Sequence, residues 1–195
     1  MKRILVAYST NAGSTAEVAE AIRKDLKGPG TAVEVRRIEE VRELGGYAAV
    51  VLGGPMIVGW HRRAARFLRA RSRELSGVPV ALFFTAMRVT PTGGEQGQGF
   101  PVLLDPRLLA GPARPGRLSF KERQTTVQSY LRPVRAALET VRPVGAAFFA
   151  GKLDYGKLPF LHMLFVMLVI GATPGDSRDW DLIGSWTREI RRKLT

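Results

Sequence analysis

A loop of small and hydroxylated residues stands near the start of the chain. It follows a short apolar run at residues 3–8, which is typical of a strand buried on both faces. The next segment, residues 16–22, carries its apolar residues at helical spacing. Free backbone N–H groups at such a helix start, together with the positive end of the helix dipole, attract an anion, usually a phosphate. The loop consists of Ser9, Thr10, Asn11, Ala12, Gly13, Ser14 and Thr15.

The side chains of this loop suit the same chemistry. Hydroxyl groups of Thr10, Ser14 and Thr15 add hydrogen-bond donors, and Gly13 lets the main chain come close to a ligand. The spacing of glycines is neither that of a dinucleotide-binding fingerprint nor that of a P-loop. The same residues also suit an ordinary turn whose hydroxyl groups cap the helix, so both interpretations stay open.

Composition points to an anionic partner and excludes several kinds of chemistry. The 30 Lys and Arg residues against 17 Asp and Glu give a net charge of +13, which favours nucleic acid, an anionic membrane surface or an acidic small molecule. The chain has no cysteine, which excludes disulfides, thiolate chemistry and Fe–S ligation. With only His61 and His162, and no cluster of ligands, we expect no metal site. No Ser/His/Asp, Cys/His or paired-carboxylate arrangement is evident for hydrolysis.

Strand and helix patterns alternate over much of the chain. Strands are expected at residues 31–37, 47–52, 79–84 and 144–150. A helix is expected around residues 60–75, and this alternation indicates a parallel sheet covered on both faces. One face of that helix is strongly basic, with Arg62, Arg63, Arg66, Arg69 and Arg73.

Two segments interrupt the alternation. Residues 88–121 are rich in Gly and Pro, which predicts a functional loop or a partly disordered one. Ser119 and Glu122 form a capping-box pattern for a helix that runs towards Thr140 and bends at Pro133. Residues 158–170 are apolar all round and too few to span a bilayer. They suit a buried core helix, or a helix that contacts a membrane, a partner or a second subunit.

The ends of the sequence complete these expectations. The chain begins directly in a strand pattern, without the apolar region of a signal peptide. We therefore expect a cytoplasmic protein, which could also sit on the inner face of the cell membrane. Asp179 or Asp181 is expected to cap a final amphipathic helix that ends in several cations.

With five strands, interleaved helices and a phosphate-type loop after the first strand, the chain resembles a flavodoxin. The resemblance implies an α/β fold with a doubly wound five-stranded parallel sheet of order 2-1-3-4-5. It implies one domain over residues 1–195, with a long insertion at about 88–121 before the last strand. FMN would lie at the carboxyl ends of the strands. The flavodoxin phosphate motif, Thr-x-Thr-Gly-x-Thr, maps onto Thr10, Ala12, Gly13 and Thr15, and Ala12 lacks the hydroxyl.

Two further FMN loops follow from the resemblance by position. The second would comprise Gly54, Pro55, Met56, Ile57, Val58, Gly59 and Trp60, and the third Thr85, Ala86, Met87 and Arg88. Trp60 is a candidate for stacking on the flavin ring, or else a core or surface residue at a helix start. His61 would lie near the flavin edge or simply open a helix. Arg88 would meet the flavin or a substrate carboxylate, or lie in solvent.

The C-terminal third resembles one branch, the menaquinone-dependent protoporphyrinogen IX dehydrogenases. The resemblance rests on residues 150–155, the apolar segment after them, and an Asp-Trp pair before the last helix. It implies oxidation of a tetrapyrrole and transfer of electrons to a membrane quinone. The Gly- and Pro-rich insertion, and the scarcity of aromatic residues around Tyr155, depart from that branch.

Three functions remain open at this stage. The first is an FMN oxidoreductase at an anionic membrane surface, with a quinone as acceptor. The second is a soluble electron carrier, which the charge of +13 disfavours because docking on a basic reductase needs an acidic carrier. The third is a flavin-free binding protein. No motif supports nucleic acid as its partner.

Overall fold

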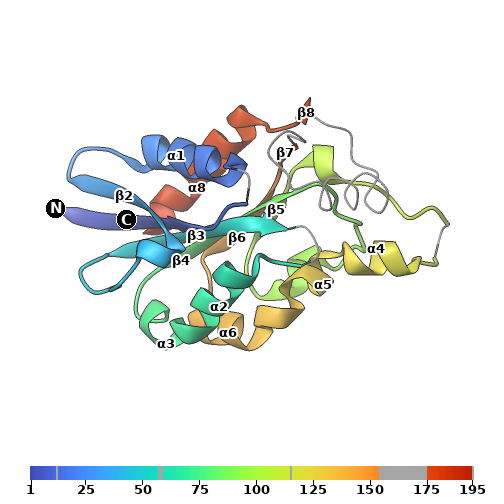
Figure 1. Cartoon of the computed structure of the whole chain (residues 1–195), viewed down its shortest axis with the longest axis horizontal. Helices are drawn as coiled ribbons and strands as arrows, with labels where there is room; N and C mark the ends of the chain where they lie inside the picture. The colour runs from blue at the N-terminus through green and yellow to red at the C-terminus, as the bar shows by residue number, and fades with distance from the viewer. Residues whose placement is uncertain (12, 57–58, 115, 154–174, 195) are drawn as a thin grey trace.

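A parallel sheet of six strands forms the centre of the molecule (Figure 1). The computed structural model describes residues 1–11, 13–56, 59–114, 116–153 and 175–194. The spatial order is β2-β1-β3-β4-β6-β5, and every neighbouring pair is parallel. The strands are β1 (Lys2–Tyr8), β2 (Thr31–Arg37), β3 (Ala49–Met56), β4 (Val80–Ala86), β5 (Val102–Leu104) and β6 (Gly145–Ala150).

The flavodoxin-like strand order is confirmed for the five expected strands, since β6 is the last of them. The edge strand β5 is an addition that comes from the insertion. It pairs with β6 from Val102 opposite Ala146 to Leu104 opposite Phe148. Only three residues long, it was too short to give a strand signal among the surrounding glycines and prolines.

The insertion is therefore more ordered than expected. It contains short helical turns at η2 (Glu95–Gln98) and η3 (Pro106–Leu108), on either side of β5. The expected long helix after it is divided into α4 (Phe120–Gln124), α5 (Val127–Leu131), η4 (Arg132–Val134) and α6 (Arg135–Val141). Pro133 lies in η4, where the expected bend occurs.

Helices cover both faces of the sheet, as the alternation predicts (Figure 1). One face carries α1 (Ser14–Leu26) and α8 (Trp180–Leu194), and the other carries α2 (Arg62–Ala70), α3 (Ser72–Leu75) and α6. The chain also forms a helical turn, η1 (Ile38–Glu40), and an antiparallel pair, β7 (Lys152–Leu153) with β8 (Gly175–Asp176).

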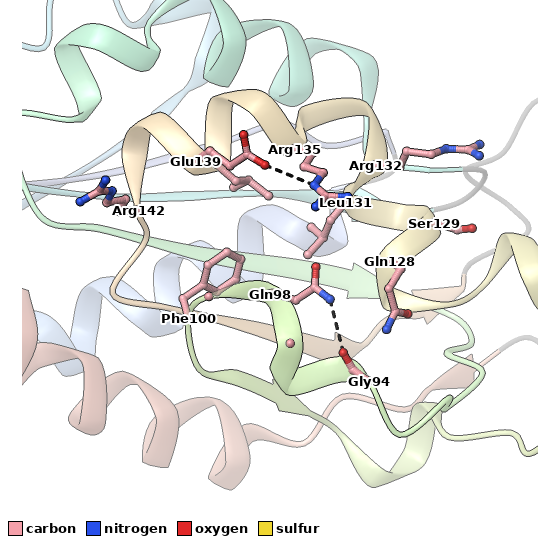
Figure 2. Close-up of a pocket in the computed structure, with 13 residues that line it drawn as sticks. Gly94, Gln98, Phe100, Gln128, Ser129, Leu131, Arg132, Arg135, Glu139 and Arg142 are labelled. Carbon is pink, nitrogen blue, oxygen red and sulfur yellow. Dashed lines mark hydrogen bonds and ion pairs between the residues drawn. The ribbon is translucent and has the colours of Figure 1, made fainter.

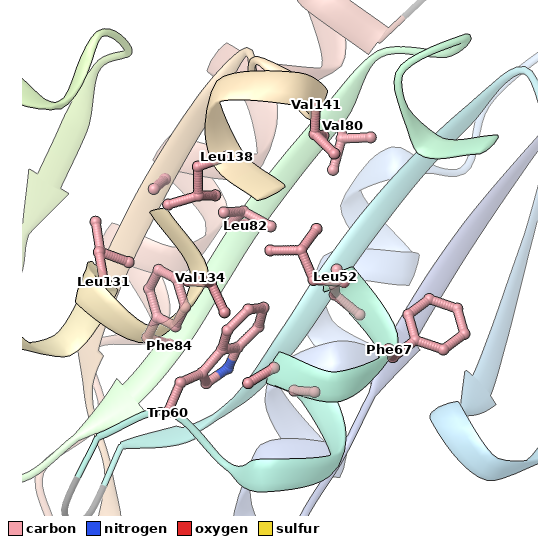
Figure 3. Close-up of a cluster of buried hydrophobic side chains, with 14 of the residues drawn as sticks. Leu52, Trp60, Phe67, Val80, Leu82, Phe84, Leu131, Val134, Leu138 and Val141 are labelled. Carbon is pink, nitrogen blue, oxygen red and sulfur yellow. The ribbon is translucent and has the colours of Figure 1, made fainter. Parts of the chain in front are cut away.

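Two hydrophobic cores hold these layers together. Beneath α2 and α6, the ring of Phe84 on β4 packs against Trp60, at 5.1 Å between centroids (Figure 3). Beneath α1 and α8, Phe149 on β6 packs edge-on against Trp186, at 5.5 Å. Central strands such as β4 are buried along their whole length, which explains their continuous apolar sequence.

Local caps agree with the sequence analysis. Ser119 Oγ accepts a hydrogen bond from the N–H of Glu122 (3.3 Å), and the Glu122 carboxylate accepts one from the N–H of Ser119 (2.7 Å). Asp179 caps α8 by accepting a hydrogen bond from the N–H of Leu182 (3.0 Å). The apolar segment 158–170 lies outside the described residues. Within the described parts of the chain, no helix is both long enough and apolar enough to cross a membrane.

Candidate functional site

Three loops that the sequence analysis placed in one site lie at the same edge of the sheet. They follow β1, β3 and β4, and parallel neighbouring strands end together. The N–H of Ser9 donates to the carbonyl of Gly53 on β3 (3.0 Å), and the N–H of Gly151 donates to the carbonyl of Ala86 on β4 (2.9 Å). The expected site residues Ala12, Ile57 and Val58 lie outside the described residues.

The first loop has open space beside its main chain at Gly13. Gly13 precedes α1 with φ +89°, a conformation that favours glycine, and a Cβ built there would meet nothing within 4 Å. Thr10 Oγ1 accepts a hydrogen bond from the N–H of Gly13 (2.9 Å). The N–H groups of Ala16 and Glu17 donate to the Gly13 carbonyl.

Two N–H groups of this helix start remain available. Ser14 and Thr15 are the first residues of α1, where an N–H has no acceptor within the helix. Among the described residues, neither group donates a hydrogen bond. The positive end of the α1 dipole lies at the same point. The loop therefore combines free N–H donors with a positive electrostatic field, and both favour a bound phosphate.

The hydroxyl of Thr15 contributes differently from what was expected. It is buried and lies 3.0 Å from the hydroxyl of Thr85, at the end of β4. One of the two hydroxyl groups donates to the other, which leaves a single hydroxyl proton for any further acceptor. The pair connects the start of α1 to the third loop.

Trp60, at the end of the second loop, belongs to the core. Met56 and Trp60 form an antiparallel bridge, and the N–H of His61 donates to the carbonyl of Pro55 (3.0 Å). Gly59 has φ +87° with open space on its Cβ side. The Trp60 side chain points into the cluster with Phe84, and only 5% of the residue is exposed (Figure 3). Of the two roles considered for Trp60, the structure shows the core residue.

His61 connects the first and second loops. Its Nε2 lies 3.0 Å from the side-chain oxygen of Asn11. Burial, followed by the nearby charge of Arg63, lowers the pKa of His61 below its ordinary value. The imidazole is therefore neutral near pH 7 and acts as a hydrogen-bonding tie between the loops, at the start of α2.

Buried polar atoms at this edge lack partners. Ser9 Oγ and Trp60 Nε1 are buried, and neither has a hydrogen-bond partner among the described residues. Both border Gly54, where a Cβ would lie 2.7 Å from Ser9 Oγ and 2.9 Å from Trp60 Nε1. Any larger residue at Gly54 would displace these side chains. Unpaired buried donors are uncommon in native proteins and typical of sites that a polar ligand or a water completes.

Arg88 follows β4 in the third loop and is half-buried. Its Nε is buried without a hydrogen-bond partner in the described structure, whereas its carbonyl accepts a hydrogen bond from the Tyr130 hydroxyl (3.0 Å). Burial raises the pKa of Tyr130 to about 12, so the phenol stays protonated and keeps that hydrogen bond. Arg88 thus offers an anion a guanidinium with free donor capacity.

Arg178 is a residue that the sequence analysis missed. Its guanidinium contacts Asp176 (2.8 Å), Glu17 (2.9 Å) and the carbonyl of Ser14 (3.4 Å), and its side chain is 2% exposed. Hydrogen bonding to Arg178 lowers the pKa of Asp176 below its ordinary value. Arg178 therefore fastens the segment before α8 onto the first turn of α1. No local pattern signals a contact between residues so distant in sequence.

Comparison with known protein families identifies the family of this chain. A family model described as a flavodoxin domain matches residues 5–179. This chain belongs to the flavodoxin family. That family supports FMN as the cofactor, in agreement with the sequence analysis. No curated protein matches the chain.

Several solved flavodoxins are similar to this flavodoxin-family chain in fold. A short-chain flavodoxin associated with a non-canonical PDU bacterial microcompartment is 10% identical, with a TM-score of 0.51 and 100% of both chains covered. The flavodoxin of Streptococcus pneumoniae TIGR4 is 8% identical, with a TM-score of 0.50 and 100% of both chains covered. A Fusobacterium nucleatum flavodoxin bound to FMN is 14% identical, with a TM-score of 0.45 and 100% of both chains covered.

Three features of the structure, independent of the family comparison, fit a phosphate-bearing cofactor at the first loop. It combines a helix start whose N–H groups have no acceptor in the described chain, a glycine with open space in front of it, and buried donors beside Gly54. Among the described residues, no group of three or more His, Cys, Asp or Glu side chains is placed to hold a metal ion.

Proposed function

We propose that this chain is an FMN-dependent oxidoreductase that binds the FMN phosphate at the start of α1. The observation that carries the proposal is the pair of N–H groups at Ser14 and Thr15, which have no acceptor among the described residues although they stand beside the open face of Gly13. Thr10 keeps the loop in shape through its hydrogen bond from Gly13. Arg178 keeps the first turn of α1 in place.

The remaining loops would surround the rest of the cofactor. Gly59 follows β3 and the third loop at residues 85–88 follows the end of β4, so both lie at the carboxyl edge of two neighbouring strands. Bound FMN supplies two-electron redox chemistry, which explains why the chain needs no nucleophile or acid–base pair. The residues of this chain have only to bind the cofactor, orient it and hold charge near it.

For the electron donor, we propose an apolar molecule that bears carboxylates, such as a reduced tetrapyrrole. Two observations support this class. Arg88 is half-buried with an unpaired Nε, and an exposed arginine, Arg62, begins α2 directly after the second loop. Arg63 is less available because it pairs with Glu39 (2.5 Å). Guanidinium groups bind carboxylates through two parallel hydrogen bonds, which also fixes orientation.

For the electron acceptor, we propose a quinone in an anionic membrane that the protein contacts at its periphery. The net charge of +13 favours such a surface. Around α4, Phe120 is 72% exposed, and its charged neighbour Glu122 is buried in backbone hydrogen bonds. Four exposed residues close to Phe120 in the sequence are cationic: Arg114, Arg117, Lys121 and Arg123.

The test is an anaerobic cycle with the FMN-loaded protein. A reduced tetrapyrrole should bleach the flavin absorption, and a menaquinone analogue in anionic vesicles should restore it faster than the same quinone in neutral vesicles. Bleaching by a flavodoxin reductase but not by the tetrapyrrole would instead support a soluble electron carrier, the function that the fold neighbours favour. Failure of both donors would contradict an oxidoreductase role.

A further inference from the structure

A groove of about 730 Å³ lies between the insertion and the helices that follow it (Figure 2). One wall is the glycine-rich turn around η2, and the other is formed by α5, η4 and α6. None of the residues of the three loops at the carboxyl edge lines it. A volume of several hundred cubic ångströms is that of sites for small organic ligands.

The groove has an apolar base, and one of its walls is formed by glycines. Phe100, Leu131 and Leu138 line it and are buried within the core that supports β4. Gly97 and Gly99 form the opposite wall, and a Cβ at either position would meet nothing within 4 Å. Side-chain amides of Gln98 and Gln128 stand between the walls (Figure 2).

Arginines mark the two ends of the groove. Figure 2 shows Arg142 at one end and Arg132 at the other, with Phe100 and Leu131 between them. Neither guanidinium has a hydrogen-bond or ion-pair partner among the described residues. By contrast, Arg135 is paired with Glu139 (3.2 Å). Arg132 begins η4 and Arg142 follows the end of α6, and Leu138 of the apolar base lies between them in the chain.

The backbone at Arg142 gives a second, independent sign. Arg142 has φ +50° and is the one residue other than glycine with positive φ among the described residues. It follows the last turn of α6, where helices commonly have glycine because a side chain is unfavourable there. Strained conformations of this kind gather at ligand sites, where the side chain has a role that offsets the backbone strain.

We propose that this groove binds an elongated organic anion with an apolar body and an acid group at each end. The apolar base takes the body, and Arg132 and Arg142 each take one acid group. The two guanidiniums lie at opposite ends of the groove, and neither has a partner among the described residues. A ligand with two acid groups can therefore pair with both, whereas a ligand with one acid group can pair with only one. The site is separate from the proposed flavin site.

The experiment is isothermal titration calorimetry of the full chain, with and without FMN. The probe is dodecanedioate, and the comparison ligands are dodecanoate, with one acid group, and succinate, with two acid groups but no apolar body. Dodecanedioate should bind about fivefold tighter than dodecanoate, the usual gain from one exposed ion pair, and far tighter than succinate. Its affinity should be the same with and without FMN.

Four variants locate the binding. Arg132→Gln and Arg142→Gly should each weaken dodecanedioate about fivefold, and Arg142→Gly also removes the backbone strain, so it should fold at least as well. Gly97→Leu should block the groove, because Gly97 has φ −76°, which leucine adopts without strain. Arg73→Gln, an exposed arginine on α3 outside the groove, lowers the net charge by the same amount and should leave binding unchanged.

Three results would overturn the proposal. Equal affinity for dodecanedioate and dodecanoate would show that the second arginine has no role. An equal loss in Arg73→Gln and in the groove variants would reduce the effect to general charge. Competition between dodecanedioate and FMN would place the ligand at the flavin site instead.

Discussion

Backbone N–H groups gather at two places in this molecule, the start of α1 and the insertion, and the two places differ in their acceptors. In the insertion and in α4 directly after it, two buried carboxylates, Asp105 and Glu122, accept them. Asp105 accepts hydrogen bonds from the N–H groups of Arg107 (2.9 Å) and Ala150 (3.0 Å). Glu122 accepts hydrogen bonds from those of Ala113 and Ser119, both at 2.7 Å.

At the start of α1, the described chain supplies no such carboxylate for Ser14 and Thr15. Glu17, the acid of this first turn, is instead paired with Arg178. The same backbone N–H chemistry stabilises the fold beside the insertion, whereas at the start of α1 it has no acceptor in the described chain and suits the phosphate site that we propose. Where the protein supplies the anion, the donors stabilise the fold; where it does not, they are available for a ligand.

The largest effect is expected at the open helix start. Gly13→Val should weaken FMN binding by at least about 100-fold, because the side chain disfavours the positive φ and stands in front of the phosphate donors. The matched control is Gly30→Val, since Gly30 also has positive φ and open space but lies far from the carboxyl edge. Fluorescence titration with FMN measures both. Equal losses in the two variants would contradict the placement.

A smaller effect is expected where the protein supplies its own anion. Asp105→Ala should lower the free energy of unfolding by about 2 kcal/mol, because it leaves the buried N–H of Ala150 without an acceptor. Urea denaturation measures the change. FMN affinity should fall less than in Gly13→Val. If stability is unchanged, Asp105 does not hold the insertion to β6.

The capping box of α4 should contribute less again. Ser119→Ala removes the acceptor of the Glu122 N–H and should destabilise the protein by about 1 kcal/mol. Ser119→Asp, which keeps a capping oxygen, serves as the control and should restore most of that loss. A stability equal to that of the unaltered chain for both variants would mean that α4 does not depend on its cap.

The smallest effect is a pH dependence at Glu122. Hydrogen bonds from Ala113 and Ser119 lower the pKa of this carboxyl from 4.5 to about 2. Because the pKa of Glu122 is lower in the folded state, its ionised carboxylate stabilises the fold. This contribution to the free energy of unfolding is present above about pH 4.5 and is lost as the pH falls towards 2. Thermal unfolding between pH 5 and pH 3 should show a shallower decline in Glu122→Gln. Identical slopes would contradict this assignment.

The part of the fold made of buried strands and amphipathic helices could be predicted from sequence. Strands such as β4 carry a continuous apolar run, and α2 places Ala64, Phe67 and Leu68 inwards at helical spacing. The capping box at Ser119 was also predicted, because its two partners are three residues apart. In each case the signal lies within a few residues of the element that it specifies.

Features that depend on distant contacts could not be predicted. The three residues of β5 form a strand because β6 is beside them, not because of a pattern of their own. Arg178 reaches Glu17 across almost the whole chain. The burial of Trp60 depends on its contact with Phe84, which the sequence of the loop does not reveal. The candidate site was predicted from its local motif at residues 10–15. The distant contacts that hold its loops in place, such as those of Arg178, were not predicted.

The most direct test of the central claim is a titration of the purified chain with FMN and, separately, with riboflavin, followed by visible absorption. If the start of α1 binds the cofactor phosphate, FMN should be taken up with shifted flavin bands, and riboflavin, which has no phosphate, should bind at least about 100-fold more weakly. Equal affinity for the two flavins, or no uptake of FMN, would contradict a phosphate site at this loop.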